Sequence, residues 1–189
     1  VVVAVGGCGP QVAEKVKKHA EAIKVGEGMG EGVEMGPVIS AKAKDRIVGL
    51  IDDAEKRGSK VVLDGRGLTV PGYENGHFLG PTVLDDVPLD APVYTEEVFG
   101  PVLAIVHADT YEEALKIVNA QPFGNGSAIF TNDGGVARRF TLDVEAGMVG
   151  VNVPIPTPVA FYSFGGWKES LLGDTHIHGS RRRYLLHPC

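Results

Sequence analysis

Val1-Val2-Val3-Ala4-Val5 is the stretch that decides the fold class, because it is a continuous apolar run rich in β-branched side chains. Such a run suits a strand that is covered on both faces, as in a parallel sheet with helices above and below it. We therefore expect residues 1–5 to form a buried strand of an α/β sheet.

Helical and strand patterns alternate along the rest of the chain. Ser40 is expected to cap a helix, and Thr110 with Glu113 has the spacing of a capping box. Helices are expected at 11–25, 40–57, from 110 onward and at 133–145, and strands at 60–64, 78–84, 101–107, 126–131 and 148–152. This order predicts an α/β fold with a mainly parallel sheet flanked by helices. Residues 153–158 contain three prolines, so an irregular Pro-rich C-terminal segment follows.

The composition excludes several classes of function. The chain has 189 residues and a net charge of −6, with no basic block before its extreme C-terminus. Because binding to phosphates requires clustered Lys and Arg, neither nucleic acid nor a membrane surface is an expected partner. No apolar stretch approaches the about 20 residues that span a bilayer. Two cysteines are too few for a disulfide framework, which favours a reducing compartment.

The first residue already belongs to the apolar run, although chain termini are normally exposed rather than core material. A strand of this kind also needs neighbours that the chain does not obviously contain. We therefore expect that residues are missing upstream.

Two groups could carry chemistry on their own. His176 and His178, with Asp174, could contribute to a metal site, but a structural site normally has four ligands, and a solvated loop is the plainer interpretation. Cys8 precedes a helix and could be a reactive thiol, but nothing near it in the sequence supplies a base. We assign neither a metal nor a nucleophile to these residues.

The segment from Glu96 to Pro101, Glu-Glu-Val-Phe-Gly-Pro, is more informative. On extended backbone, Glu97 and Phe99 would project to the same side. A carboxylate can accept both hydroxyls of a ribose, while a ring packs against a flat heterocycle. From the spacing alone, Glu97 could instead be a surface residue and Phe99 a core residue, with no ligand between them.

Several further motifs accompany this segment, one after another along the chain. They are Met35 to Ile39, Gly80 to Leu84, Phe123 to Gly126, Phe130-Thr131, Gly147 to Asn152 and Phe164 to Ser170. With Glu96 to Pro101, this ordered set resembles the landmarks of the NAD(P)-dependent aldehyde dehydrogenase superfamily. Asn152 to Pro158 and Trp167 to Thr175 are similar to the CoA-acylating methylmalonate-semialdehyde dehydrogenases within it.

The resemblance implies the catalytic domain of such an enzyme, with NAD as cofactor and coenzyme A as co-substrate. The semialdehyde of malonate or methylmalonate would give acetyl-CoA or propionyl-CoA with loss of CO2, as in valine and inositol breakdown. By similarity, Glu97 would bind the nicotinamide-side ribose and Phe99 would pack beside the nicotinamide. Asn152, with the Pro-rich loop after it, would shape the floor of the substrate pocket.

The resemblance also implies what the chain lacks. In this subfamily the catalytic cysteine and the dinucleotide-binding half lie before residue 1, and Cys8 takes neither role. Residues 1–152 are then the catalytic α/β domain, truncated at its N-terminus, and 153–189 are a substrate-site loop and a divergent tail. No catalytic residue is assigned, and the isolated chain is expected to be inactive.

The tail after Gly179 departs from the relatives, whose final strand pairs across subunits. A homo-oligomer is implied for full-length relatives but is not carried over to this chain, and Arg181 to Arg183 could contact CoA or be solvated. The implied location is the cytoplasm, or the mitochondrial matrix in a eukaryote. A non-catalytic remnant or assembly module, and an aldehyde dehydrogenase of other specificity, stay open as alternatives.

Overall fold

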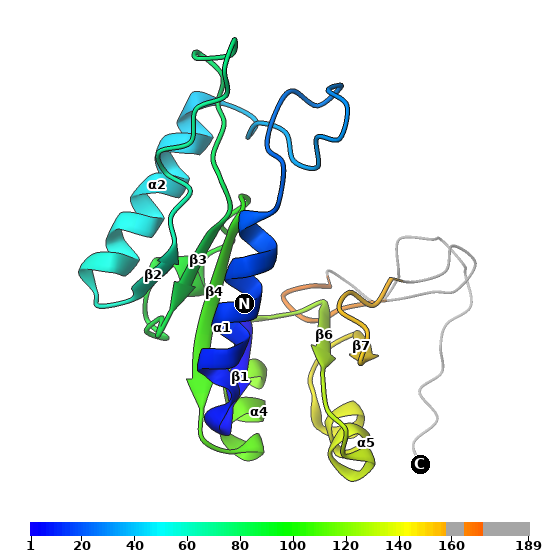
Figure 1. The fold of residues 1–189 in the computed structure, drawn as a ribbon. Coiled ribbons are helices and arrows are strands. Elements are labelled where there is room, and N and C mark those ends of the chain that lie inside the picture. Colours follow the sequence, from blue (N-terminus) through cyan, green and yellow to red (C-terminus); the bar gives the residue numbers. More distant parts are fainter. Residues whose placement is uncertain (158–164, 172–189) are drawn as a thin grey trace. The chain divides into compact units, whose positions relative to one another are not determined.

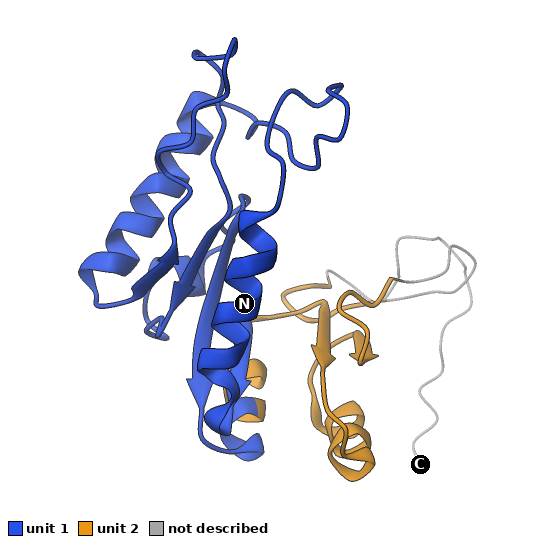
Figure 2. Cartoon of the chain, viewed as in Figure 1, with its two compact units in different colours: residues 1–114 blue, residues 115–189 orange. Residues whose placement is uncertain are grey.

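A computed structural model describes residues 1–157 and 165–171 of the chain (Figure 1). The chain divides into two compact units, residues 1–114 and 115–189 (Figure 2). The boundary falls inside helix α4 (Tyr111–Asn119). Each unit is described by itself below.

The first unit is built on a sheet of four strands. They are β1 (Val2–Val5), β4 (Val102–Ala108), β3 (Thr82–Asp85) and β2 (Lys60–Leu63), in that spatial order. β4 is parallel to both of its neighbours, β1 and β3. β2 is antiparallel to β3 and has an irregular register between Val61 and Leu63. The prediction of a mainly parallel α/β sheet is confirmed.

Helix α1 (Gly9–Glu21) packs against this sheet. Pro10 lies in its first turn, where the missing N–H costs no helical hydrogen bond. The helix buries Ala13 in a cluster with Ala4, Val83 and Ile105, of which Ile105 is fully buried. The helix ends at Glu21, four residues before the predicted end at residue 25.

The expectation that residues 1–5 are covered on both faces is wrong for this structure. Only Ala4 of the run is buried, and Val1 is 65% exposed. β1 is the outermost strand of the sheet, because it pairs with β4 on one side and no strand of the described residues pairs with its other edge. Elements that pack on a sheet cover a strand at its margin less completely than a strand at its centre. The run therefore forms an edge strand.

Helix α2 (Ala41–Lys56) begins where the sequence predicted. The Ser40 hydroxyl accepts a hydrogen bond from the Ala43 N–H at 3.1 Å, which satisfies one of the free donors of the first turn. Its buried face consists of Ile47, Leu50, Ile51 and Ala54. Ala43, in the first turn, is only half-buried. A short helix, α3 (Pro92–Thr95), packs against α2 and was not predicted.

Helix α4 begins with the predicted capping residues. The Glu113 N–H donates to the Thr110 hydroxyl at 3.2 Å, and the Glu113 carboxylate accepts from the Asp109 N–H at 2.8 Å. In a capping box the carboxylate would reach the N–H of the cap residue itself. Here the carboxylate reaches the N–H of the preceding residue, Asp109. Two backbone N–H groups at the helix start are therefore still satisfied by side chains.

The second unit holds two short parallel strands, β6 (Gly126–Ile129) and β7 (Met148–Val151). Helix α5 (Gly134–Asp143) connects them, and its N-cap Asp133 accepts from the Val136 N–H at 2.9 Å. These three elements were predicted. A second pair, β5 (Phe123–Gly124) with β8 (Trp167–Lys168), is antiparallel and was missed, because two-residue strands leave no periodic pattern.

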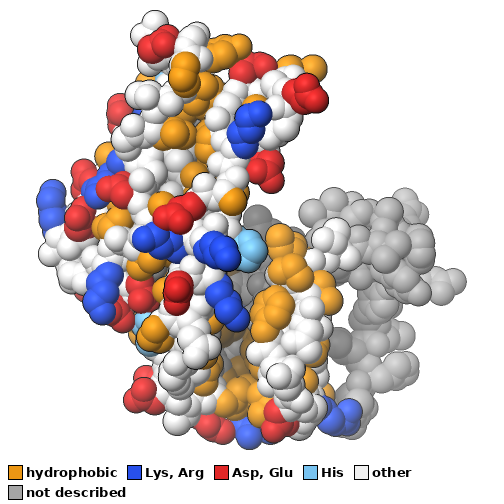
Figure 3. Space-filling model, in the orientation of Figure 1, with side chains coloured by type: hydrophobic (Ala, Val, Ile, Leu, Met, Phe, Trp, Pro, Cys, Tyr) orange, Lys and Arg blue, Asp and Glu red, His pale blue; other side chains and the backbone are white. Residues whose placement is uncertain are grey.

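Hydrophobic side chains also reach the surface of the second unit (Figure 3). Those following the two parallel strands include Phe130, Val153 and Ile155, which are between 50% and 75% exposed. Residues 153–157 form neither helix nor strand, as the prolines predicted. Among the helices of the described residues, none combines the length and apolar character needed to cross a membrane.

Candidate functional site

Glu97 and Phe99 lie in the segment that links helix α3 to strand β4, just before the amino end of that strand. Both side chains are exposed, and Phe99 exposes 79% of its surface. Phe99 has a φ of +51°, so the backbone is not extended at this residue. The period-two argument for a shared side therefore does not apply, and the two residues are brought together only by their place in one segment.

Helix α2 holds this segment through Arg46. One guanidinium nitrogen, Nη1, donates to the Val98 carbonyl at 2.9 Å, and the other, Nη2, donates to the Glu97 carbonyl at 2.7 Å. Nη2 also lies 3.7 Å from a carboxylate oxygen of Glu96. Hydrogen bonds from a charged donor are stronger than those between neutral groups, and the planar guanidinium suits two acceptors at once. Sequence reasoning missed Arg46, because its partners are 51 and 52 residues away.

Gly100 lets the segment approach the same helix. A Cβ atom on Gly100 would lie 2.5 Å from Cδ1 of Ile47, which is itself buried. A side chain at residue 100 would therefore require the buried Ile47 side chain to shift. After Gly100, the Pro101 carbonyl accepts from the Thr82 N–H at 2.8 Å, which joins the segment to the sheet.

Asn152 lies in the second unit, directly after β7, with a φ of +55°. Its Nδ2 donates to the Thr131 carbonyl at 3.0 Å, and its Oδ1 accepts from the Thr131 N–H at 3.0 Å. Its own N–H donates to the Ile129 carbonyl at 2.8 Å. Both polar groups of the side chain are therefore engaged with backbone, and Asn152 ties together the chain segments that follow β6 and β7.

Lys168 gives the strand β8 its place in the second unit. Its ammonium lies 2.8 Å from the Glu145 carboxylate and donates to the carbonyls of Asn119 and Gln121. These carbonyls lie at the C-terminal end of α4, where a cation is favoured. A Cβ atom on Gly147 would overlap the Gly165 carbonyl, so the chain around residue 165 also passes directly against residue 147.

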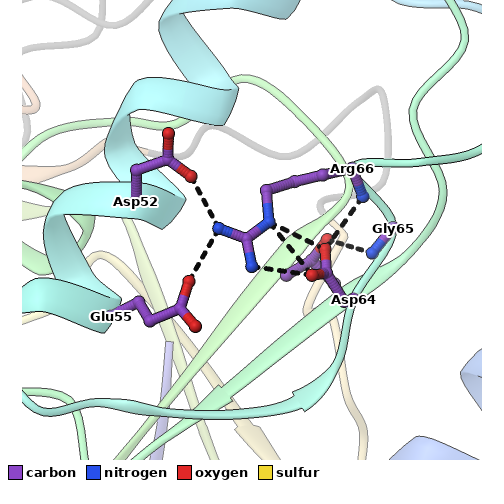
Figure 4. Close-up of polar contacts among 6 residues, drawn as sticks. Asp52, Glu55, Asp64, Gly65 and Arg66 are labelled. Atoms are coloured by element: carbon purple, nitrogen blue, oxygen red, sulfur yellow. Dashed lines mark hydrogen bonds and ion pairs between the residues drawn. The ribbon is translucent and has the colours of Figure 1, made fainter.

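Arg66 is at the centre of a cluster of charged side chains in the first unit (Figure 4). Its guanidinium donates to Asp64, Asp52 and Glu55 at distances between 2.6 and 3.1 Å. These hydrogen bonds raise the pKa of Arg66 and, in return, lower the pKa of Asp64. With its donors directed to three carboxylates, Arg66 joins α2 to the loop after β2 and is not assigned to a ligand.

A second cluster lies where β3 and β4 end, opposite to the end of β4 that carries Phe99. The His107 Nε2 lies 2.7 Å from Asp85 and 3.3 Å from Asp86, and the three side chains could together face a metal ion. Lys60 already lies 2.6 Å from Asp86, and this contact lowers the pKa of Asp86 and raises the pKa of Lys60. Because an ammonium neutralises one of the carboxylates, we assign no metal to this cluster.

Cys8 is exposed, in the 3-10 turn Gly6–Cys8 before α1. Within residues 1–157 and 165–171, no hydrogen bond to its thiol is observed, and it stays without an assigned role. Asp174, His176, His178 and Arg181 to Arg183 lie outside the described residues.

Comparison with known proteins identifies the relatives of this chain. It is 47% identical over 175 residues to the malonate-semialdehyde dehydrogenase of Pseudomonas aeruginosa, covering 90% of this chain and 35% of that protein. It is 46% identical over 172 residues to the mitochondrial acylating methylmalonate-semialdehyde/malonate-semialdehyde dehydrogenase of Bos taurus, covering 91% and 31%.

A solved structure from Sinorhizobium meliloti, complexed with NAD, superimposes with a TM-score of 0.90 at 46% identity. The match covers 95% of this chain and 37% of that one, so the chain spans about a third of the length of these relatives. Residues 2–186 match the model of the aldehyde dehydrogenase family. The chain belongs to the aldehyde dehydrogenase family.

Proposed function

We propose that this chain is part of an NAD-dependent, CoA-acylating dehydrogenase of malonate or methylmalonate semialdehyde. The observation that carries the proposal is the 46–47% identity to relatives of that name across about nine-tenths of the chain. The reaction balances as malonate semialdehyde, CoA and NAD⁺ giving acetyl-CoA, CO2 and NADH. Methylmalonate semialdehyde would give propionyl-CoA in the same way.

In this proposal, Glu97 and Phe99 form one corner of the NAD site. Both side chains are exposed and therefore free of the packing that would hide them from a ligand. An exposed carboxylate can accept the two hydroxyls of a ribose, and an exposed ring can pack against a flat nicotinamide. NAD would supply the hydride acceptor, while these residues of the chain would bind and orient it.

Asn152 would contribute to the shape of the substrate pocket. Both polar groups of its side chain bind Thr131, so we assign it the support of the pocket floor and no direct hydrogen bond to substrate. Residues 1–152 would belong to the catalytic domain, and 153–189 would form a substrate-site loop and tail. The nucleophilic cysteine is assigned to neither Cys8 nor Cys189, so the 189-residue chain alone would be inactive.

The proposed setting follows from the same relatives. The Bos taurus relative is described as mitochondrial, which supports the mitochondrial matrix for a eukaryotic source of this chain, with the cytoplasm for a bacterial one. The partners would be the semialdehyde and CoA, with no nucleic acid or membrane, and full-length relatives would form homo-oligomers.

The test uses a chimera in which residues 2–186 replace the matching segment of the Pseudomonas aeruginosa relative. Semialdehyde-dependent NADH formation with CoA is measured for the chimera and for the 189-residue chain. We expect activity in the chimera only. Turnover by the 189-residue chain would overturn the inactivity, and a chimera that folds but reduces no NAD would overturn the assigned activity.

Within the chimera, Glu97→Gln removes a charged acceptor at the proposed ribose site. The loss of a charged hydrogen bond is worth about 1.5–3 kcal/mol, which is about 10- to 150-fold in KM for NAD. Glu14→Gln removes an exposed carboxylate of helix α1 that has no hydrogen bond or ion pair among the described residues, and it is the matched control, with an expected change in KM for NAD below about threefold. An unchanged KM for NAD in Glu97→Gln would remove Glu97 from the site.

A further inference from the structure

We infer that Arg46 is a positioning residue that presets the Glu97–Phe99 segment for NAD. The inference deepens the proposed function and rests on it. Its basis is the pair of hydrogen bonds from the two terminal nitrogens of Arg46 to the Val98 and Glu97 carbonyls, at 2.9 and 2.7 Å. Arg46 itself need not touch the cofactor in this role.

The two bonds act on consecutive peptide groups, directly before Phe99. The φ of +51° at Phe99 is a left-handed conformation that a residue with a large side chain rarely adopts. Such a conformation persists only where the surroundings impose it. Arg46 restrains the chain on the N-terminal side of Phe99 through the two carbonyls.

The next residue of the same helix restrains the other side of Phe99. Ile47 lies under Gly100, so close that a Cβ atom there would be 2.5 Å from its Cδ1. Ile47 is buried and therefore cannot easily move aside. Two neighbouring residues of α2 thus bracket Phe99, and the helix acts as a template for the backbone that carries Glu97 and Phe99.

Arg57, the C-cap of the same helix, provides a matched control. Its guanidinium pairs with Asp53 at 2.7 Å and with Asp90 at 3.3 Å, and its exposure of 40% is close to the 45% of Arg46. It makes no contact with residues 96–100 among the described hydrogen bonds and ion pairs. Arg57→Met therefore removes an equivalent cation without releasing the segment.

The first experiment measures the freedom of the segment in the 189-residue chain. A Glu-specific protease cuts after Glu97, at the carbonyl that Arg46 binds, and it also cuts after the exposed Glu74 of another loop. Because local opening governs cleavage of a folded chain, Arg46→Met should speed the cut at Glu97 about tenfold relative to Glu74. Arg46→Lys keeps the charge but cannot bind both carbonyls with a planar guanidinium, so it should give a smaller increase in cleavage at Glu97. Arg57→Met should give no increase.

Two results would overturn the positioning role. One is an unchanged ratio of cleavage at Glu97 to cleavage at Glu74 in Arg46→Met. The other is an equal acceleration at both sites, which would mean that Arg46 stabilises the unit as a whole. Arg46→Lys keeps the experiment decisive if Arg46→Met does not fold.

The second experiment measures NAD use in the chimera described above. Arg46→Met should raise KM for NAD by about as much as Glu97→Gln does, while KM for the semialdehyde stays within about twofold. If Glu97→Gln raises KM for NAD and Arg46→Met does not, the inference is wrong. If Glu97→Gln itself has no effect, the proposed NAD corner fails, whereas the cleavage ratio still decides whether Arg46 holds the segment.

Discussion

Replacing Asn152 by Gly and by Ala separates two contributions to the stability of the second unit. Both substitutions remove the two hydrogen bonds with Thr131, which at this exposed position are worth about 0.5–1 kcal/mol each. Gly tolerates the φ of +55° but adds about 0.5–1 kcal/mol of freedom to the unfolded chain. Ala adds about 1–2 kcal/mol for a left-handed backbone. We expect unfolding free energies lower by about 2 kcal/mol for Asn152→Gly and about 3 kcal/mol for Asn152→Ala.

The assay uses the single tryptophan of the chain, Trp167, which lies in the same compact unit. Its fluorescence is followed during unfolding in denaturant, and midpoints are compared at equal slopes. Asn125→Ala changes an exposed asparagine of this unit that has a negative φ and no side-chain hydrogen bond among the described residues. Its expected effect is within about 0.5 kcal/mol. If Asn152→Ala lowers the free energy of unfolding no more than Asn152→Gly does, the argument from the left-handed backbone is wrong. If neither variant differs in stability from Asn125→Ala, the hydrogen bonds between Asn152 and Thr131 do not stabilise the unit.

Three further changes test the first unit. Ile51→Ala removes a fully buried side chain of α2 and should lower the free energy of unfolding by about 2–5 kcal/mol in denaturant titration, and a loss below about 1 kcal/mol would contradict its core position. Ser40→Ala removes the acceptor for the Ala43 N–H and should cost about 0.5–2 kcal/mol, with Ser40→Asp as the restoring variant. The pKa of Asp64 is lowered below its ordinary 3.8 by hydrogen bonds from Arg66, so the unfolded state takes up the proton first and stability falls as the pH drops through that range. Asp64→Asn should therefore flatten the loss of stability as the pH falls below about 4, and an unchanged pH profile would contradict the pairing.

The helix starts were predictable because their signals are local. Ser40 and Asp133 each bind an N–H three residues further along the chain. A side-chain oxygen at that spacing meets a free donor of the first turn whatever the rest of the protein does. The proline-rich stretch was predictable for a similar reason, since a missing N–H acts on its own residue.

The supports of the candidate site were not predictable. Arg46 reaches carbonyls 51 and 52 residues away, and Asn152 clamps a residue 21 positions earlier. Backbone carbonyls are present at every residue, so the sequence marks no partner for a guanidinium or an amide. The strand pair β5 and β8 was missed because each strand is only two residues long.

From sequence alone, the alternation of helices and strands, the residues that cap the helices and the family landmarks with Glu97, Phe99 and Asn152 could be determined. These features depend on interactions between residues close in sequence, or on short motifs that can each be identified from a few consecutive residues. Only the tertiary structure decided that residues 2–5 form an edge strand, that Phe99 has a left-handed backbone and that Arg46 binds the segment before it. Each of these depends on which distant segment lies alongside, and packing determines that in three dimensions.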